Sequence, residues 1–501
     1  MREKEIFLRS FLLMFLFLFT LQITVGAVKI YPIPVGLKSS DVYRVFINEQ
    51  EVFVYDSPVP AAYCSFDMNS GVEIVIKVNR DVKWVDVRPL AAGVIPIFKD
   101  STIRLYLKKP MQLSIELNGS IKMPLFIFAN SFEKNIPSKN DPNVLFFEAG
   151  KMYHPGIITL KDNQTLYVEG GAFVTAVIEA NNAKNIRICG RGVLDGTYNY
   201  DFDDALIKAG TFSEKTNEEG KKYHRFINLR DCENVTVEGV TMHNSTSWDV
   251  VPIHCNKVHI DNIKIVSDNA SDDGIDIVRS RNVLIENCFI RTKDDCIAIK
   301  TLMDYPKSEG IDSVLVRHCI FWNAAWGNGL EIGFELNSLE VKNIRFIDND
   351  IIHVEAGAAI SIHNAGTATV SDLIFENIRI EDVRQKLFDL AIFRSQYSDD
   401  GTHDEAERKK LYLNGVWDGV LSVPPNEKEA HAKFRGHIQN VLLKNIQIID
   451  GGLPFSIFYG SDNSHKVKQV TIKNLTLHGK RITSLKDAKF YLENTSDIKI
   501  Q

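Results

Sequence analysis

A short strand-like pattern recurs through the C-terminal half of the chain, at intervals of 23 to 31 residues apart from one interval of 68. Each copy has apolar residues at its first and third positions, and most have Asn at the fifth. Because a single turn of this length cannot bury its own apolar face, such repeats stack into one continuous core. The pattern predicts an all-β fold with a right-handed parallel β-helix over residues 140–501. A leucine-rich repeat is the competing architecture, but its helical segment is missing. The copies begin at Val235, Val258, Val283, Val314, Ile344, Leu373, Val441 and Val470.

Residues 28–135 follow a different pattern of short alternating strands separated by Pro, Gly and Asn turns. This pattern predicts a small N-terminal β-sandwich domain ahead of the β-helix. We expect the sandwich to cover the open end of the coil, with carbohydrate binding as the alternative role. The interval of 68 residues contains an insertion at about 395–437, whose charged segment 404–410 predicts a helix at the rim of one coil.

The first 27 residues predict a signal peptide. Basic residues precede the apolar run 11–19, and small residues lead to a cleavage site after Ala27. No later segment approaches the ~18 consecutive apolar residues of a membrane-spanning helix. We therefore expect a secreted or periplasmic protein with no membrane association after cleavage.

The charge and the cysteines bear on nucleic-acid binding and on disulfide formation. A formal charge of −6 gives no indication of nucleic-acid binding. The seven cysteines are an odd number without a CxxC spacing, so we expect buried packing residues rather than a disulfide framework. The sequence predicts neither a metal site nor a cofactor.

Two segments place Asp directly ahead of an Ile-rich strand: residues 271–277 read SDDGIDI and residues 293–300 read KDDCIAIK. If these segments lie in successive turns of one coil, Asp273 and Asp295 stack about 5 Å apart with Asp294 beside them. Three neighbouring carboxylates raise the pKa of at least one of them, so one group holds a proton while another is ionised. The segments therefore predict an acid–base site, although Asp is also common in plain turns.

The strands that follow these acids predict a sheet face with many polar groups. In the predicted register, one column of this face contains Asp249, Asp273, Asp295 and Asn328. Such a face suits an extended, hydroxyl-rich polymer, on which an exposed aromatic ring can stack. The candidate substrate-binding residues are Asn328, Lys300, His363, Asp249, Trp326 and Glu331. Weaker candidates are Glu335 and, in the insertion, Tyr397, His403 and Trp417.

At these residues the chain resembles glycoside hydrolase family 28, the polygalacturonase family, and more loosely the family 49 dextranases and isopullulanases. The resemblance covers residues 144–450, and the family's Asp-Asp-Cys strand is present unaltered at 294–296. It implies an inverting hydrolase that uses no cofactor. By position, Asp294 is the general acid, and Asp273 and Asp295 hold and deprotonate the attacking water. An inverting pair needs about 6.5–9.5 Å between acid and base to admit that water.

Two motifs depart from the family pattern. The family's Gly-His-Gly is here Gly327-Asn328-Gly329, and its Arg-Ile-Lys is Ser361-Ile362-His363. The second change removes the cationic pair that the resemblance assigns to a uronate carboxylate. Because burying an unpaired carboxylate costs several kcal/mol, we expect a neutral or modified, dextranase-like polysaccharide rather than plain polygalacturonate. Lys300 and His363 share one outward column and could supply a replacement positive site.

Two other functions fit the same architecture. A polysaccharide lyase acting on a uronate-containing glycan would need a cation such as Ca²⁺ and a basic residue beside it. A non-catalytic glycan-binding β-helix would keep the groove and make the three acids incidental.

Overall fold

The computed structural model describes residues 27–57, 59–197, 225–301, 305–402, 404–411 and 420–501. The predicted signal peptide lies outside these ranges except for Ala27, and so do His403 and Trp417. Helices α3 (Glu405–Leu411) and α4 (Lys428–Ala432) belong to the insertion, so the prediction of a helical segment there is confirmed. None of the helices in these ranges is long and apolar enough to cross a membrane.

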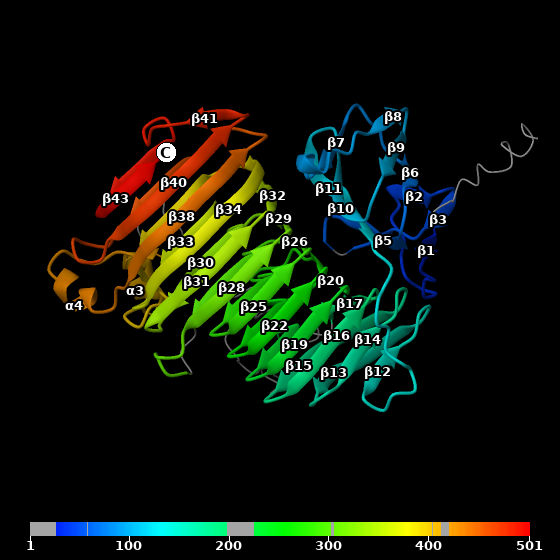
Figure 1. The fold of residues 1–501 in the computed structure, drawn as a ribbon, viewed down its shortest axis with the longest axis horizontal. Coiled ribbons are helices and arrows are strands. Elements are labelled where there is room, and N and C mark those ends of the chain that lie inside the picture. Colours follow the sequence, from blue (N-terminus) through cyan, green and yellow to red (C-terminus); the bar gives the residue numbers. More distant parts are fainter. Residues whose placement is uncertain (1–26, 58, 198–224, 302–304, 403, 412–419) are drawn as a thin grey trace, which may run out of the picture.

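The N-terminal part is a sandwich of two sheets, drawn in blue in Figure 1. Residues of β6 alternate between buried and exposed, as expected for a strand with one face toward a core. Apolar side chains from both sheets, such as Ile74 and Ile127, pack in one cluster. One sheet contains β1 (Val28–Ile30), β5 (Ala62–Met68), β11 (Ser120–Asn130), β10 (Met111–Leu117) and β7 (Val85–Arg88), with β4 (Tyr55–Asp56) beside β5. The other contains β3 (Gln50–Val52), β2 (Tyr43–Ile47), β6 (Val72–Val78), β9 (Thr102–Leu107) and β8 (Ile97–Lys99).

From Val144 onward the chain winds into a right-handed parallel β-helix, as the repeat predicts (Figure 1). In the central coils each turn contributes three strands, and each strand pairs in parallel with its equivalent in the next turn. The predicted repeat corresponds to β19 (Glu233–Glu238), β22 (Asn256–Asp261), β25 (Arg281–Glu286), β28 (Ile311–Arg317), β31 (Glu340–Ile347), β34 (Thr369–Val383), β38 (His437–Ile448) and β40 (Val467–Leu477).

The other two strands of each turn form the two sheets that matter for function. We call the first the site sheet and the second the packing sheet. The site sheet contains β21 (Val250–Ile253), β24 (Ile275–Val278), β27 (Ile297–Thr301), β30 (Leu330–Leu336), β33 (Ala358–Asn364) and β35 (Lys386–Ile392). The packing sheet contains β17 (Val193–Asp195), β20 (Thr241–His243), β23 (Lys264–Val266), β26 (Phe289–Thr292), β29 (Ile320–Asn323) and β32 (Asp350–Val354).

The predicted register is wrong by one residue in β21. Val250 pairs with Ile275, so Val250 rather than Val251 points into the core of the coil. Val251 instead packs outside with Val278 and Trp248. The cause is that β21 reads Val-Val-Pro-Ile, in which every residue is apolar and the two-residue alternation therefore cannot fix which side faces the core.

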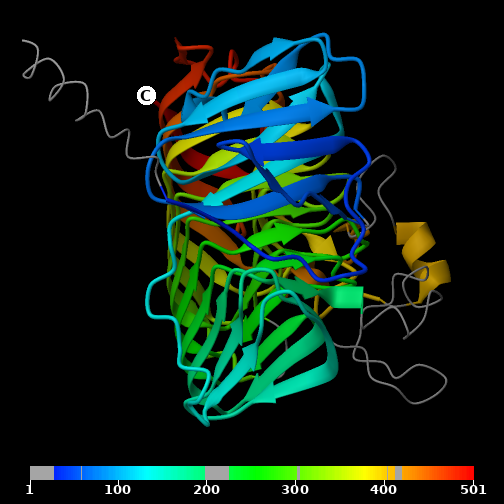
Figure 2. The same cartoon turned by 90° about the vertical axis from the view of Figure 1, so that its right-hand side faces the viewer.

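The sandwich lies along the side of the coil and not over its end, which corrects the expected capping role (Figures 1 and 2). The packing sheet carries large apolar side chains on its outer face, and these need cover from water. Phe126 of the sandwich contacts Phe289 and Trp322, with ring centroids 4.8 and 5.7 Å apart. Farther along the interface, Tyr63 lies 3.0 Å from the Nδ1 atom of His243.

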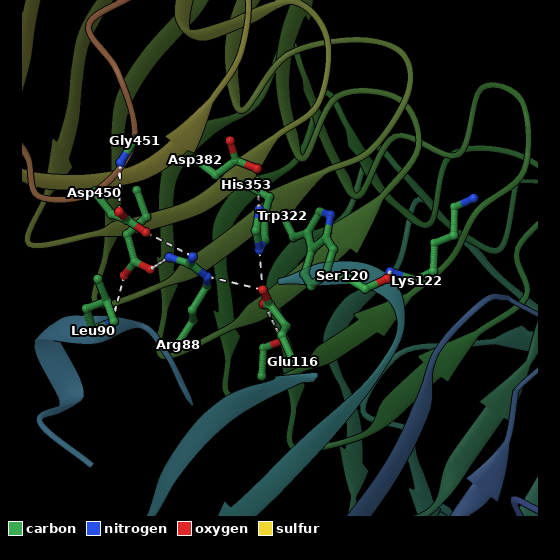
Figure 3. Close-up of polar contacts among 12 residues, drawn as sticks. Arg88, Leu90, Glu116, Ser120, Lys122, Trp322, His353, Asp382, Asp450 and Gly451 are labelled. Carbon is green, nitrogen blue, oxygen red and sulfur yellow. Dashed lines mark hydrogen bonds and ion pairs between the residues drawn. The ribbon is translucent and has the colours of Figure 1, made fainter. Parts of the chain in front are cut away.

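A largely buried group of charged residues, the interdomain cluster, joins the sandwich to the later coils (Figure 3). Arg88 of β7 forms ion pairs with Glu116, Glu381 and Asp450, with distances of 3.2 Å to Glu116 and 3.0 Å to Asp450. His353 of β32 lies 3.0 Å from Glu116 and 3.0 Å from Asp382. The interdomain cluster consists of Arg88, Glu116, His353, Glu381, Asp382 and Asp450.

Candidate active site

The structure brings Asp273, Asp295 and Asn328 into one ladder at the start of the site-sheet strands. The amide of Gly274 donates to the carbonyl of Asp295 at 2.8 Å, and the amide of Cys296 donates to the carbonyl of Asn328 at 3.1 Å. These bonds place the three residues at equivalent positions in successive turns, as predicted. Gly274 allows the close approach, since a Cβ there would lie 2.5 Å from the carbonyl oxygen of Cys296.

Asp294 lies beside this ladder and is the most accessible of the three acids. It is partly exposed, whereas Asp273 and Asp295 are 2% and 9% exposed. An oxygen of Asp294 accepts a hydrogen bond of 3.0 Å from the amide of Asp295, which fixes the direction of its carboxyl group. A group that must protonate a leaving oxygen needs this combination of fixed geometry and access.

Asp272 holds the segment that carries Asp294, a role that the sequence argument missed. Its Oδ1 accepts hydrogen bonds from the amides of Lys293 and Asp294 at 2.9 and 3.0 Å, and its Oδ2 accepts one from the amide of Asn269. Burial raises the pKa of Asp272 to about 7. The only sequence signal for this role was that two adjacent Asp residues occur in both segments.

Burial and mutual repulsion raise the pKa of several carboxyls in the site. Burial, and next the charge of Asp273, raise the pKa of Asp294. Burial, and then the charges of Asp294 and Glu331, raise the pKa of Asp295. Burial and Asp273 also raise the pKa of Asp276. The site therefore retains protons at a pH where ordinary aspartates are fully ionised.

Lys300 forms ion pairs with two acids of the site. Its Nζ lies 2.7 Å from Asp273 and 3.1 Å from Asp276, and 4.0 Å from the centroid of the Trp248 ring. The lysine is 7% exposed. Its charge is thus balanced within the protein by two carboxylates that the sequence did not place around it.

His363 is paired in the same way, and Asn328 connects it to the acid ladder. The imidazole lies 3.0 Å from Glu331 and 3.2 Å from Asp389. Asn328 donates from Nδ2 to Glu331 at 3.0 Å and to Asp295 at 3.2 Å. The structure consequently does not join Lys300 and His363 into a free positive site, and that prediction is wrong.

The remaining candidates differ in their access to solvent. Trp326 is 48% exposed at the edge of the site, with the Nζ of Lys293 4.6 Å from its ring centroid. Tyr397 of the insertion is 40% exposed and stacks on Phe334 at 6.3 Å. Both aromatic rings can therefore contact a bound sugar.

Asp249 is fully buried and does not lie in the column of Asp273, Asp295 and Asn328 in which the sequence placed it. The amide of Asp249 donates to the carbonyl of Asp273, and with the one-residue shift in β21 this places Asp249 beside Gly274. Burial, followed by the charges of Asp272 and Asp273, raises its pKa. In the part of the chain that the structure describes, no three His, Cys, Asp or Glu side chains converge as metal ligands.

Comparison with known proteins agrees with this geometry. The family model described as "Glycosyl hydrolases family 28" matches residues 135–402. A polygalacturonase of Juniperus ashei is 27% identical over 201 residues, which cover 39% of this chain and 37% of that protein. A polygalacturonase of Chamaecyparis obtusa is 30% identical over 200 residues, covering 38% and 35%. The match thus spans little more than a third of these relatives.

The solved structure of Dex49A from Penicillium minioluteum shares the fold across almost the whole chain. Its TM-score is 0.61 at 15% sequence identity, and the superposition covers 94% of this chain and 96% of that one. At this identity the likeness concerns the fold alone.

Proposed function

Because the chain belongs to glycosyl hydrolases family 28, whose model matches more than half of it, we propose that it hydrolyses α-glycosidic bonds of a polysaccharide with inversion. The observation that carries the proposal is the convergence of Asp273, Asp294 and Asp295 directly ahead of β24 and β27. Acid–base hydrolysis needs one carboxyl that holds a proton and another that is ionised, and the raised pKa of Asp294 beside Asp273, which is paired with Lys300, suits that division.

The three acids have separate roles. Asp294 is the general acid because it is the most accessible of the three acids, and burial and the charge of Asp273 raise its pKa. Asp273, ion-paired with Lys300, and Asp295, which accepts hydrogen bonds from Asn328, orient and deprotonate the attacking water. The departing sugar oxygen takes the proton of Asp294, and the water adds to the opposite face of the anomeric carbon.

The substrate is a neutral or modified glycan rather than plain polygalacturonate. Lys300 and His363 each face two carboxylates, so neither offers an unbalanced charge to a uronate. A substrate carboxylate would instead meet several acids of the site in a partly desolvated setting, which is unfavourable. Trp326 and Tyr397 supply the apolar surfaces on which neutral sugar rings stack.

A glycan panel tests these statements together. Purified protein is incubated with dextran, a neutral galactan and polygalacturonate, and the anomers of the first products are followed by NMR. We expect hydrolysis of a neutral glycan with an inverted anomer. Strong cleavage of polygalacturonate would refute the neutral substrate, and a retained anomer would refute inversion. An unsaturated product that absorbs in the ultraviolet would indicate a lyase, and binding without turnover would indicate a glycan-binding module.

We also propose that the protein is exported, because residues 1–27 have the composition of a signal peptide. Mass spectrometry of the protein recovered from its producing cells should give a mature chain that begins at Val28. Recovery of a chain that still carries the first 27 residues would contradict export by cleavage.

A further inference from the structure

The positions that depart from the family motifs meet at one side chain, Glu331. Its Oε2 accepts hydrogen bonds from Asn328 at 3.0 Å and from Ser361, and it lies 3.0 Å from the Nδ1 atom of His363. Asn328 stands in the Gly-His-Gly position, and Ser361 and His363 stand in the Arg-Ile-Lys positions. Three substitutions that look independent in the sequence therefore form one contact group in the fold.

This contact group reaches the acid ladder through Asn328. The backbone amide and the Nδ2 of Asn328 donate to the same oxygen of Asp295, at 2.7 and 3.2 Å. The Oδ1 of Asn328 accepts from the amide of Ala358 at 2.9 Å, so the orientation of the amide group is fixed. Asn328 therefore joins one oxygen of Asp295 to one oxygen of Glu331.

Glu331 is a buried carboxylate whose cationic partner is His363. It is 1% exposed, and its Oε1 has no hydrogen-bond partner among the described residues. A buried carboxylate with so few donors needs a neighbouring cation to keep its charge. Loss of the His363 charge would disturb the Oε2 atom that holds the Nδ2 of Asn328, and through Asn328 it would disturb Asp295.

We propose that Glu331 and His363 form a buried ion pair that positions Asp295 through Asn328, so that both are positioning residues for the proposed base. The inference rests on the proposed function, in which Asp295 helps to activate the attacking water. In this proposal Asn328, Ser361 and His363, which replace family motif residues, help to position the base and do not bind a substrate carboxylate.

The charges around His363 support this role over a wide pH range. The groups that face the imidazole are Glu331 from β30, Asp389 from β35 and, through Asp389, Lys386. Although burial lowers the pKa of His363, Glu331 and Asp389 raise it to about 9. The imidazolium is therefore present at neutral pH and is lost as the pH rises through about 9.

The test compares His363→Gln and Glu331→Gln with His259→Gln. His259 lies on β22, outside the site sheet, and is also paired with a glutamate, at 2.9 Å. On the glycan identified by the panel, we expect each site variant to lower kcat about 10- to 100-fold with a much smaller change in KM, because both residues are buried and act through Asn328. His363→Lys should restore part of kcat, and His259→Gln should match the wild type.

Two outcomes would overturn the proposal: His363→Gln with kcat within about twofold of the wild type, or an equal loss in His259→Gln. A second measurement, which does not need turnover, tests the ion pair even if a variant folds poorly or the wild type is inactive. The titration of the His363 imidazole is followed by ¹⁵N NMR in the wild type and in Glu331→Gln. We expect a lower pKa in the variant, and an unchanged pKa would refute the ion pair. If the wild type cleaves no glycan, the proposed function fails while the titration still decides whether the pair exists.

Discussion

The site acids and the interdomain cluster both bring together largely buried carboxylates, but they differ in how many cations accompany them. In the interdomain cluster Arg88 contacts three acids and His353 contacts two, so every acid has a positive partner. In the site, Asp249, Asp272, Asp273, Asp276, Asp294 and Asp295 lie close together and Lys300 contacts only two of them.

Because of this difference in pairing, the carboxyl pKa values shift in different directions in the two groups. Burial alone would raise the pKa of Glu116 and Asp382, but contacts with His353, and with Arg88 or Arg384, hold both pKa values below the ordinary range. Glu381 is the exception, because burial raises its pKa to about 7 despite Arg88. In the site, the pKa values of Asp249, Asp272, Asp276, Asp294 and Asp295 are all raised, with burial as the main cause. Matched charges hold two domains together, whereas unmatched acids keep protons available for chemistry.

The largest expected effect is on turnover. Asp294→Asn removes the transferable proton, so kcat should fall about 10²- to 10⁴-fold while the fold is kept. Kinetics on the glycan identified by the panel, together with circular dichroism, check this result. Asp81→Asn, an exposed position on the sandwich, is the control and should leave kcat unchanged. Full activity in Asp294→Asn would exclude it as the general acid.

The next effect is on stability. Arg88→Ala leaves Glu116, Glu381 and Asp450 without their shared cation, which should destabilise the contact between the domains by about 3 to 5 kcal/mol. Urea unfolding followed by tryptophan fluorescence measures the change. The matched control is Arg104→Ala, which removes an exposed pair with Glu73 on the same sandwich and should have little effect. Equal losses in the two variants would show that the interdomain cluster does not hold the domains together.

The smallest effect is a pH dependence. Burial lowers the pKa of His353, but Glu116 and Asp382 prevail and raise it above the ordinary value of about 6.5. Its contribution to stability is thus fully present below about pH 6.5 and is lost as the pH rises through the folded-state pKa. Thermal unfolding of His353→Gln should therefore differ from wild type more near pH 5.5 than near pH 9. A difference that grows with pH would reverse the assigned charge of His353.

The fold was predictable because its signal is local and repeated. Apolar residues at fixed positions in copies such as Val258 and Val283 are enough to indicate stacked strands. The exception was β21, where Pro252 and three aliphatic neighbours carry no alternation. The lateral position of the sandwich was not predictable, because the covering contacts of Phe126 with Phe289 and Trp322 join segments more than 160 residues apart.

The site was predictable only where its residues lie in one motif. The alignment of Asp273 with Asp295 followed from two similar segments, and the structure places them in one ladder. The pairing of Lys300 with Asp276 and of His363 with Glu331 and Asp389 depends on which side chains share a face across turns. The spacing of residues along the chain does not indicate such pairing, so the sequence suggested that Lys300 and His363 were unpaired.

The sideways attachment of the sandwich has a mechanical consequence. In a solenoid each turn touches only its neighbours, so turns can fray one after another. Here one domain contacts the coil from His243 to Asp450, so it braces the turns that carry Asp273 and Asp295 from outside. The turns that carry Asp273 and Asp295 therefore keep their spacing even when the terminal turns of the coil loosen.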